Sequence, residues 1–294
     1  MCDSIITLFL KNFSILIHSK NEDTKMEEIE EIFQHCLNKY SVEKKRIPIE
    51  INRQKTAMAK DLEDYQKAIA ENDRSLIRGY QNMLRDKEYE LKAYEEKSSF
   101  LREPTKEDIS YRWQQCEGFS QKVAQYADEN EMLCFHGTDI FGAKHIIESG
   151  KISSGADRLG HATSFDPPGK ISVTNKDTVD TSVKNYMSLI GDFLYPAGCL
   201  FVVKPKDKPE YDKLSSSGWM IDNVDFKENP DRLVAIVTTP ENIERVSQWA
   251  GKGGIDSSKV MLFEKFVERC KSNSIASHGK MQTHQRSGGK ELNI

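Results

Sequence analysis

The sequence lacks the cysteine spacing of a zinc site or of a disulfide framework. Its six cysteines are scattered along 294 residues without a CxxC pair or a Cys/His cluster. This argues against both kinds of site and indicates a reducing compartment. A strong charge of one sign is also missing, because the formal net charge is -4 and the pI is near 6.0. We therefore expect no overall attraction to nucleic acid or to anionic lipid.

Long apolar runs are missing as well. The first 17 residues are mostly apolar, but Lys11, Asn12 and Ser14 interrupt them, and Asp3 stands where a secretory signal would be basic. We expect neither a membrane span nor a signal peptide here. The segment is a core-packing strand or helix, an interfacial anchor, or sequence upstream of a true start at Met26. We favour the core-packing interpretation.

Glycine and proline are rare in residues 26–101, where the chain is highly charged and its apolar residues recur at helical spacing. One helix is predicted to end near residues 38–41. Two further apolar stripes, residues 58–69 and residues 77–94, flank a polar cluster at residues 71–73 that fits a turn. The pattern predicts a helical hairpin, or one long helix with a coiled-coil-like stripe. Packing within the chain is favoured over a partner-binding coiled coil, because the heptads are few and irregular.

A domain boundary is predicted where this arm ends. Pro104 marks the end of the arm. Thr105, followed three residues later by Asp108, is typical of a helix start. Residues 271–294 have almost nothing to bury, which predicts a disordered tail. With charged residues at 30% and apolar residues at 37%, the composition fits a soluble globular protein. We therefore expect three parts: an N-terminal helical arm (1–103), a second domain (104–270) and a polar tail (271–294).

Strands and helices alternate in the second domain. Residues 133–135 fit a short buried strand that is followed by His136 and ends at a glycine, Gly137. A helix over residues 140–148 is stopped by a glycine, and a strand at residues 171–173 precedes a helix over residues 179–189. Three more apolar runs are residues 198–203 and 232–239, which predict strands, and residues 260–267, which fit a strand or a helix. The whole pattern predicts an α+β fold.

Four short motifs occur in order along this domain. They are His136-Gly137-Thr138, a helix ending Ile146 to Gly150, Gly169-Lys170 before a strand, and Asn185-Tyr186 in the next helix. In this order they resemble the NAD-binding core of the ADP-ribosyltransferase superfamily, in the branch related to diphtheria toxin and the poly(ADP-ribose) polymerases. The resemblance covers roughly residues 130–250. It implies a split β-sheet domain that uses NAD as its substrate.

The resemblance assigns NAD-binding roles to several residues. Breaking the bond between nicotinamide and ribose builds positive charge on the sugar, so a site must hold both groups. His136 would bond the ribose, the backbone of Gly137 would bond the nicotinamide amide, and the ring of Tyr186 would stack on nicotinamide. The predicted cofactor-binding set also includes Thr138, Ser172 and Ser182. The plainer alternatives are a satisfied strand-end histidine, a strand-ending turn and a core tyrosine.

The chain departs from the family's pattern at three positions. A second stacking tyrosine, expected after Gly169-Lys170, is absent, and Ser172 and Val173 stand in its place. Val183 stands where the family has a serine that bonds the amide, and Ser182 lies one residue earlier. Val234 stands where the family has its catalytic glutamate. The nearby carboxylates are Glu228 and Asp231, which we take as candidate catalytic residues, although each is also typical of a solvated surface. Without the family's glutamate, transfer of a single unit is expected rather than chain elongation.

The sequence thus predicts a mono-ADP-ribosyltransferase that moves ADP-ribose from NAD to a protein target chosen by the helical arm. The alternatives are an NAD glycohydrolase and a non-catalytic module that binds a protein or a nucleotide. We expect no metal, no nucleic acid partner and a cytoplasmic location. In a bacterial effector-type enzyme, the polar tail fits a signal for translocation into a host cell.

Overall fold

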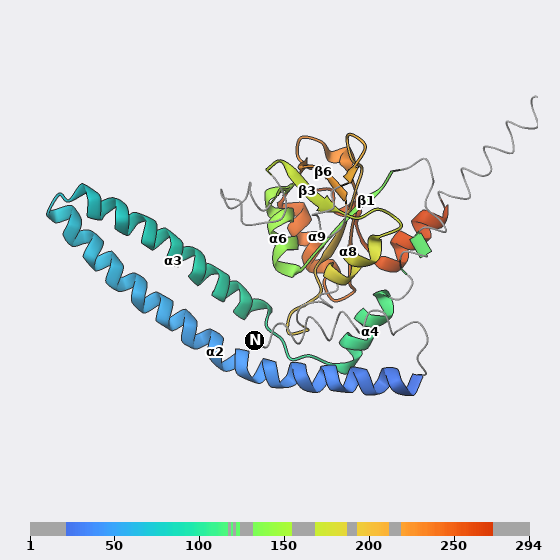
Figure 1. The fold of residues 1–294 in the computed structure, drawn as a ribbon, viewed down its shortest axis with the longest axis horizontal. Coiled ribbons are helices and arrows are strands. Elements are labelled where there is room, and N and C mark those ends of the chain that lie inside the picture. Colours follow the sequence, from blue (N-terminus) through green and yellow to red (C-terminus); the bar gives the residue numbers. More distant parts are fainter. Residues whose placement is uncertain are drawn as a thin grey trace, which may run out of the picture. The chain divides into compact units, whose positions relative to one another are not determined.

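The computed structural model describes residues 22–116, 119, 122–123, 132–154, 168–186, 193–211 and 219–272. The chain is a mixed α/β protein in which two long helices precede small mixed sheets (Figure 1). It divides into two compact units. The helical unit contains both long helices and the chain as far as Ile109, together with Phe193–Tyr195, and the second unit contains the sheets.

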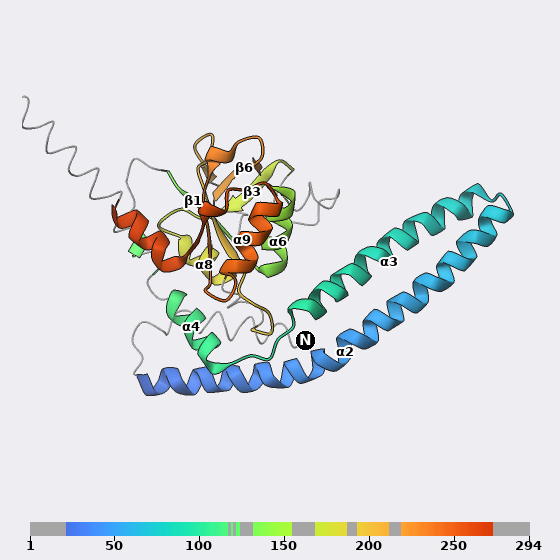
Figure 2. The ribbon, with the colours of Figure 1, turned by 180° about the vertical axis from the view of Figure 1, so that it is seen from behind.

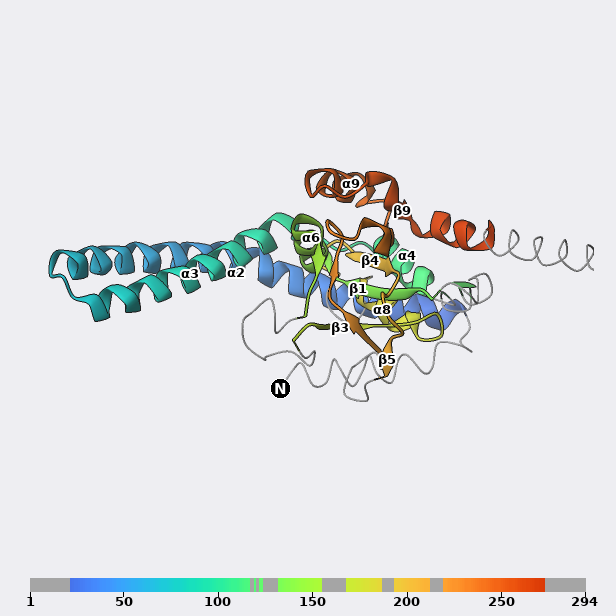
Figure 3. The same ribbon diagram turned by 90° about the horizontal axis from the view of Figure 1, so that it is seen from above.

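The helical unit is a hairpin of α2 (Glu22–Ala70) and α3 (Arg74–Phe100), which run side by side in all three views (Figures 1, 2 and 3). The prediction of a helix end at residues 38–41 is wrong, because α2 continues through them and through Pro48. A proline inside a helix removes one backbone hydrogen bond. Cys36 and Ile47 are nevertheless buried before it, so packing holds the helix where local propensity favours an end.

Four polar pairs join the two helices and fix their register. They are Gln54–Glu90, Lys55–Glu95, Asp61–Lys87 and Tyr65–Gln81. From Gln54–Glu90 through Asp61–Lys87 to Tyr65–Gln81, residue numbers fall along α3 as they rise along α2, so each level of one helix faces a defined level of the other. Gln54 Nε2 donates to Glu90 Oε2 over 2.8 Å, and Gln81 Nε2 donates to the Tyr65 hydroxyl over 3.0 Å.

The predicted turn at residues 71–73 is confirmed. Asp73 caps α3, and its carboxylate accepts from the backbone N–H groups of Ser75 and Leu76 at 3.0 and 3.1 Å. Asn72 has a φ of 56°, a left-handed conformation that asparagine tolerates better than most residues. The residues that form this turn, Asn72 and Asp73, can therefore be recognised from the sequence alone.

The predicted helix start at Thr105 is also confirmed. The hydroxyl of Thr105 accepts from the backbone N–H of Asp108 over 3.1 Å, at the start of α4 (Lys106–Cys116). Lys106 pairs with Glu30 of α2, and its ammonium lies 5.2 Å from the centre of the Phe33 ring. These contacts attach the first turn of α4 to the base of the hairpin.

The second unit is built on two main sheets. The first has the order β1 (Cys134–Thr138), β4 (Cys199–Val203), β8 (Leu233–Thr238) and β9 (Val260–Leu262). Its first three strands are antiparallel, and β9 is parallel to β8. The second is antiparallel, with the order β3 (Lys170–Val173), β6 (Trp219–Asp222) and β5 (Glu210–Tyr211). A short pair joins β2 (Lys151–Ile152) to β7 (Val224–Asp225).

The first sheet is buried on both faces. Because side chains alternate along a strand, Cys134 faces one core and Phe135 faces the other. The Cys134 side is covered by α6 (Ile140–Ser149), α9 (Ile243–Lys252) and residues of β3 and β6. Figure 2 shows α6 and α9 next to each other on this side. The other side is covered by α8 (Val179–Tyr186) and by a helix over residues 263–272.

The predicted strands and helices of this unit recur with small shifts in their bounds. Residues 260–267, which fitted either type, contain both: β9 ends at Leu262 and a helix begins at Phe263. The sequence did not predict α9 or the short strands β5, β6 and β7. Residues 1–21 and 273–294, which include the apolar start and most of the predicted tail, lie outside the described residues. Within the described residues, no helix carries an apolar stretch able to cross a bilayer.

Candidate active site at the split between two sheets

Strands β1 and β3 meet at one bridge and then separate. Phe135 N donates to Thr174 O over 2.8 Å, and Thr174 N donates to Phe135 O over 2.9 Å. A continuous antiparallel ladder would next join Gly137 to Ser172. The strands part there instead, so the bridge is where the two sheets split.

The side chain of His136 makes the next contact with β3, in place of a backbone hydrogen bond. Its Nδ1 lies 3.1 Å from the backbone carbonyl oxygen of Ser172. A carbonyl oxygen only accepts, so Nδ1 carries the proton and Nε2 is the acceptor nitrogen of the neutral ring. The structure thus brings together two of the predicted residues, His136 and Ser172, through the main chain of Ser172. The imidazole is half-buried at the split.

The backbone of Gly137 faces the split. Peptide groups alternate sides along a strand, and those of Phe135 point toward Thr174. The N–H and C=O of Gly137 therefore point the same way, away from β4, where no described residue bonds them. A side chain is impossible here, because a Cβ on Gly137 would lie 1.7 Å from the carbonyl oxygen of Ser182. The glycine lets α8 lie directly against β1.

Buried hydroxyls hold this arrangement in place. Thr174 Oγ1 donates to Ser182 Oγ over 2.9 Å, and Ser182 Oγ donates to Phe135 O over 3.0 Å. Both hydroxyl side chains are almost fully buried. Ser182, a predicted cofactor-binding residue, therefore sits beside Gly137, and its hydroxyl bonds the backbone of β1. Thr174 is not among the predicted cofactor-binding residues, although its hydroxyl directly follows the buried residues of β3.

The end of β1 is shaped by the start of α6. Asp139 caps that helix, and its Oδ1 accepts from Gly142 N over 2.8 Å. Thr138 packs against the same turn, because a Cβ on Gly142 would lie 2.1 Å from Thr138 Oγ1. Gly150 ends α6 at a φ of 73°, as the motif predicted. Tyr186 is the last residue of α8, and its side chain lies outside the described residues.

No family model, no curated protein and no solved structure matches this chain. The function must therefore be argued from the site and not from relatives.

The two candidate carboxylates lie on another segment. Glu228 follows β7, and Asp231 lies in a short 3-10 helix (Pro230–Arg232) that leads into β8, which β4 separates from β1. Both side chains are exposed, and neither forms a hydrogen bond or ion pair with the part of the chain that the structure describes. Val234 is half-buried in β8 against the core. The structure therefore does not gather Glu228 or Asp231 with the groups at the split.

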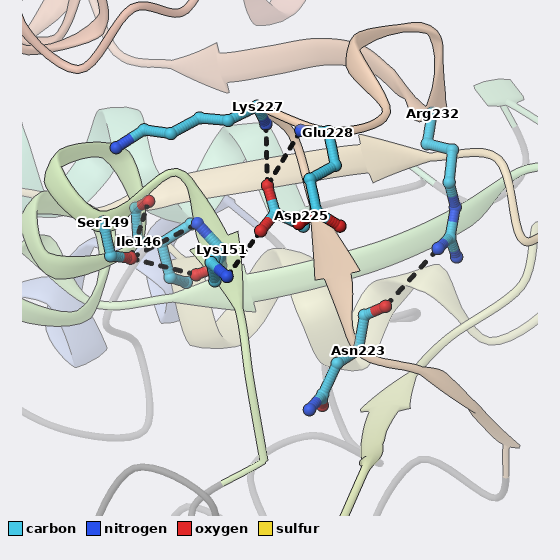
Figure 4. Close-up of polar contacts among 8 residues, drawn as sticks. All are labelled: Ile146, Ser149, Lys151, Asn223, Asp225, Lys227, Glu228 and Arg232. Atoms are coloured by element: carbon cyan, nitrogen blue, oxygen red, sulfur yellow. Dashed lines mark hydrogen bonds and ion pairs between the residues drawn. The ribbon is translucent and has the colours of Figure 1, made fainter.

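Their neighbour Asp225 is held firmly (Figure 4). Lys151 Nζ lies 2.6 Å from its carboxylate, and the backbone N–H groups of Lys227 and Glu228 donate to it over 2.9 and 3.0 Å. The Lys151 contact, followed by these backbone bonds, lowers the pKa of Asp225 below its ordinary value. This carboxylate stabilises the turn before β8.

Two more carboxylates share a sheet with Ser172. Its cross-strand neighbours are Met220 and then Glu210, so all three side chains project from one face. On that face, Lys170 Nζ lies 2.9 Å from Asp222 and 3.1 Å from Glu210. These groups line a pocket of about 170 Å³ whose floor includes the buried Met220. No sequence pattern predicted this pocket, because β5 and β6 were not recognised as strands.

Other kinds of chemistry find little support at this site. Burial raises the pKa of the Cys134 and Cys199 thiols to about 12, so neither is a thiolate near neutral pH. The searched part of the chain contains no group of three His, Cys, Asp or Glu side chains arranged to hold a metal ion. The groups at the split are thus an imidazole, a glycine backbone and hydroxyls.

Proposed function

We propose that the second unit is an ADP-ribosyltransferase-like domain that moves one ADP-ribose unit from NAD to a side chain of a protein. The observation that carries this proposal is the main chain of Gly137. Its N–H and C=O face the split while His136, and not the glycine, contacts the carbonyl of Ser172. A strand edge with one donor and one acceptor complements a carboxamide, which presents one of each.

The groups around Gly137 suit the nicotinamide and the ribose, which are joined by the C–N bond that breaks. The nicotinamide amide pairs with the Gly137 backbone, and a ribose hydroxyl donates to Nε2 of His136. When the C–N bond breaks, nicotinamide leaves with the bonding electrons and the ribose carbon becomes cationic. The acceptor side chain then attacks that carbon and loses a proton. The separation of the first and second sheets at Phe135 and Thr174 supports the split-sheet architecture that the motifs imply.

The positions of the carboxylates support transfer of a single unit. Val234 occupies the place of the family's acid, and Glu228 and Asp231 are exposed on the segment before β8. We assign one of these two carboxylates, the nearest acids to Val234 in the sequence, to the developing cation. Because the structure does not gather it with His136, the loop that carries it must move toward the split. The helical hairpin, a compact unit of its own, selects the protein target.

Incubation with NAD labelled in the adenylate part, with and without candidate acceptor proteins, tests the proposal. Label that becomes covalently attached to protein supports transfer. Free labelled ADP-ribose without labelled protein identifies an NAD glycohydrolase instead. If intact NAD alone is recovered, the domain is a non-catalytic binding module and the proposal is wrong. The His136→Ala variant is the blank in each arm, because it removes the ribose contact.

A further inference from the structure

One face of the hairpin carries an uncovered apolar stripe. It consists of Met58, Leu62, Tyr65 and Ile69, which recur along α2 at steps of four and three. Leu62 and Ile69 remain 47% and 50% exposed, although each is a large apolar side chain. Two helices alone leave the outer part of each apolar stripe in water, and four helices packed as a bundle cover it.

Two charged residues of α3 lie on the same face. Gln81 bonds the stripe residue Tyr65, which identifies this face on α3. Arg78 and Glu88 precede and follow Gln81 by three and seven residues, so they lie on the same side of the helix. Within the described residues, neither has a hydrogen bond or an ion pair from its side chain. Each is thus a free charge of opposite sign beside the stripe.

The stripe and the charge pair share one midpoint. The middle of the stripe falls between Glu63 and Asp64, and Met83 is midway between Arg78 and Glu88. The interhelix pairs Tyr65–Gln81 and Asp61–Lys87 place residues 63–64 of α2 level with residues 83–84 of α3. A rotation by 180° about this level therefore superposes the stripe on its copy and brings Arg78 opposite Glu88 at the same time.

We infer that this face binds the same face of a second copy of the chain, so that two hairpins form an antiparallel four-helix bundle. The two-fold axis crosses both helices at right angles, at the level of residues 63–64 and Met83. Leu62 then lies opposite Tyr65 of the second copy, close to the axis. Arg78 pairs with Glu88 of the second copy, twice by symmetry, which is the self-complementarity that a two-fold interface requires.

Orientation and size both favour this arrangement. A parallel pairing would lay α2 on α3 of the second copy and set Arg78 level with the apolar Ile69, where a buried guanidinium has no partner. In the antiparallel pairing about 20 residues of each helix overlap, roughly 30 Å by 20 Å, or on the order of 600 Å² per copy. Stable complexes bury roughly 800 Å² per partner. The face is therefore at the small end of the range for specific complexes, which fits a dimer of moderate stability.

Sedimentation equilibrium of the full chain over a range of concentrations tests the inference. The unaltered protein should be dimeric at micromolar concentration. Leu62→Glu places a charge near the axis in both copies and should weaken the dimer by about a hundredfold or more. Leu76→Glu is the matched control, because Leu76 is 48% exposed on α3 and is not part of this face. Circular dichroism checks that both variants keep their helices.

A charge exchange locates the axis. Arg78→Glu and Glu88→Arg should each weaken the dimer roughly tenfold, since each sets like charges together twice. The double variant should recover the unaltered affinity, because it restores opposite charges across the axis. Lys60→Glu, an exposed change on α2, should have little effect. A protein that is monomeric at every concentration, a control that weakens the dimer as much, or a double variant without recovery overturns the inference. None of these outcomes bears on NAD cleavage.

Discussion

The hairpin and the sheet unit obtain their structures from different ranges of the sequence. In the hairpin, most of both helices follows from local periodicity, and the turn follows from Asp73 and Asn72; packing is needed only where α2 continues through residues 38–41. In the sheet unit, the site exists only because β1, β3 and α8 meet, with Ser172 and Ser182 far along the chain from His136 and Gly137. Substitutions that look alike in the sequence should therefore have opposite consequences in the two units.

Alanine at a glycine gives the sharpest contrast. Gly137→Ala would place its Cβ 1.7 Å from Ser182 O, so α8 must move away and the strand edge that faces the carboxamide is lost. We expect NAD cleavage to disappear and the free energy of unfolding to fall by roughly 1–3 kcal/mol. Gly79→Ala, in the exposed middle of α3 with nothing within 4 Å, should instead stabilise the hairpin by roughly 0.5–1 kcal/mol. Thermal unfolding and NAD turnover measure both. Equal effects in the two units would remove the contrast.

Removing the imidazole separates chemistry from folding. His136→Ala should lower NAD turnover by about a hundredfold or more, because the ribose loses its acceptor. The half-buried ring lies at the end of a strand, outside the two apolar cores, so we expect little change in melting temperature. His145→Ala, exposed on α6, serves as the control. A large drop in the melting temperature of the His136 variant would make the histidine structural.

The effect of each substitution on kcat shows which carboxylate faces the developing cation. Glu228→Gln or Asp231→Asn should lower kcat by on the order of a hundredfold for the residue that faces the cation, with NAD affinity nearly unchanged. Glu148→Gln, an exposed change on α6, is the matched control. If both variants cleave NAD as the parent does, Glu210→Gln and Asp222→Asn come next, because these acids share the sheet of Ser172.

A polar pair in the hairpin should affect stability alone. Asp61→Ala leaves the ammonium of Lys87 without its partner in a mostly buried position. We expect the hairpin to lose about 2 kcal/mol of unfolding free energy. NAD cleavage without a protein acceptor should be unaffected. Far-ultraviolet circular dichroism during urea unfolding measures the first effect, and a matching loss of NAD cleavage would contradict the independence of the two units.

The smallest effect concerns pH. The folded-state pKa of Asp225 is lowered, chiefly by Lys151, so its contribution to stability is present above the ordinary aspartate pKa. It is lost as the pH falls through the lower folded value, that is, below about pH 4. Asp225→Asn should flatten that part of the stability curve, by less than about 1 kcal/mol because the pair is partly exposed. Unfolding in urea between pH 3 and pH 6 measures it.

The sequence predicted the parts of the fold that local chemistry decides. Thr105, Asp73 and Gly150 each end or begin a helix through a bond or a backbone conformation of their own. The end of a helix at residues 38–41 was predicted wrongly, because tertiary packing around Cys36 and Ile47 overrides weak local signals. The short strands β5 to β7 were missed, since strands of two to four residues show too little alternation to be recognised.

The sequence predicted individual residues of the candidate site but not their arrangement. The order of short motifs placed His136, Gly137 and Ser182 in one predicted cofactor-binding set, and the structure brings them together at the split. No sequence pattern indicated the point at which β1 and β3 separate. The bond from His136 to a main-chain oxygen, which depends on that separation, was therefore not predicted either. The roles of Glu228 and Asp231 stay predictions, because the segment that carries them is positioned by long-range pairing.

The pairing of β1 has a consequence for how the chain folds during synthesis. Both hairpin helices are complete by Phe100, and their contacts lie within a few tens of residues, so this unit can form early. β1 emerges next but pairs with β4, which lies roughly 60 residues later and takes several seconds more to synthesise. During that interval the apolar strand that carries His136 has no partner. Its protection depends on Gly137 and the polar residues around it, which limit the length of exposed apolar edge.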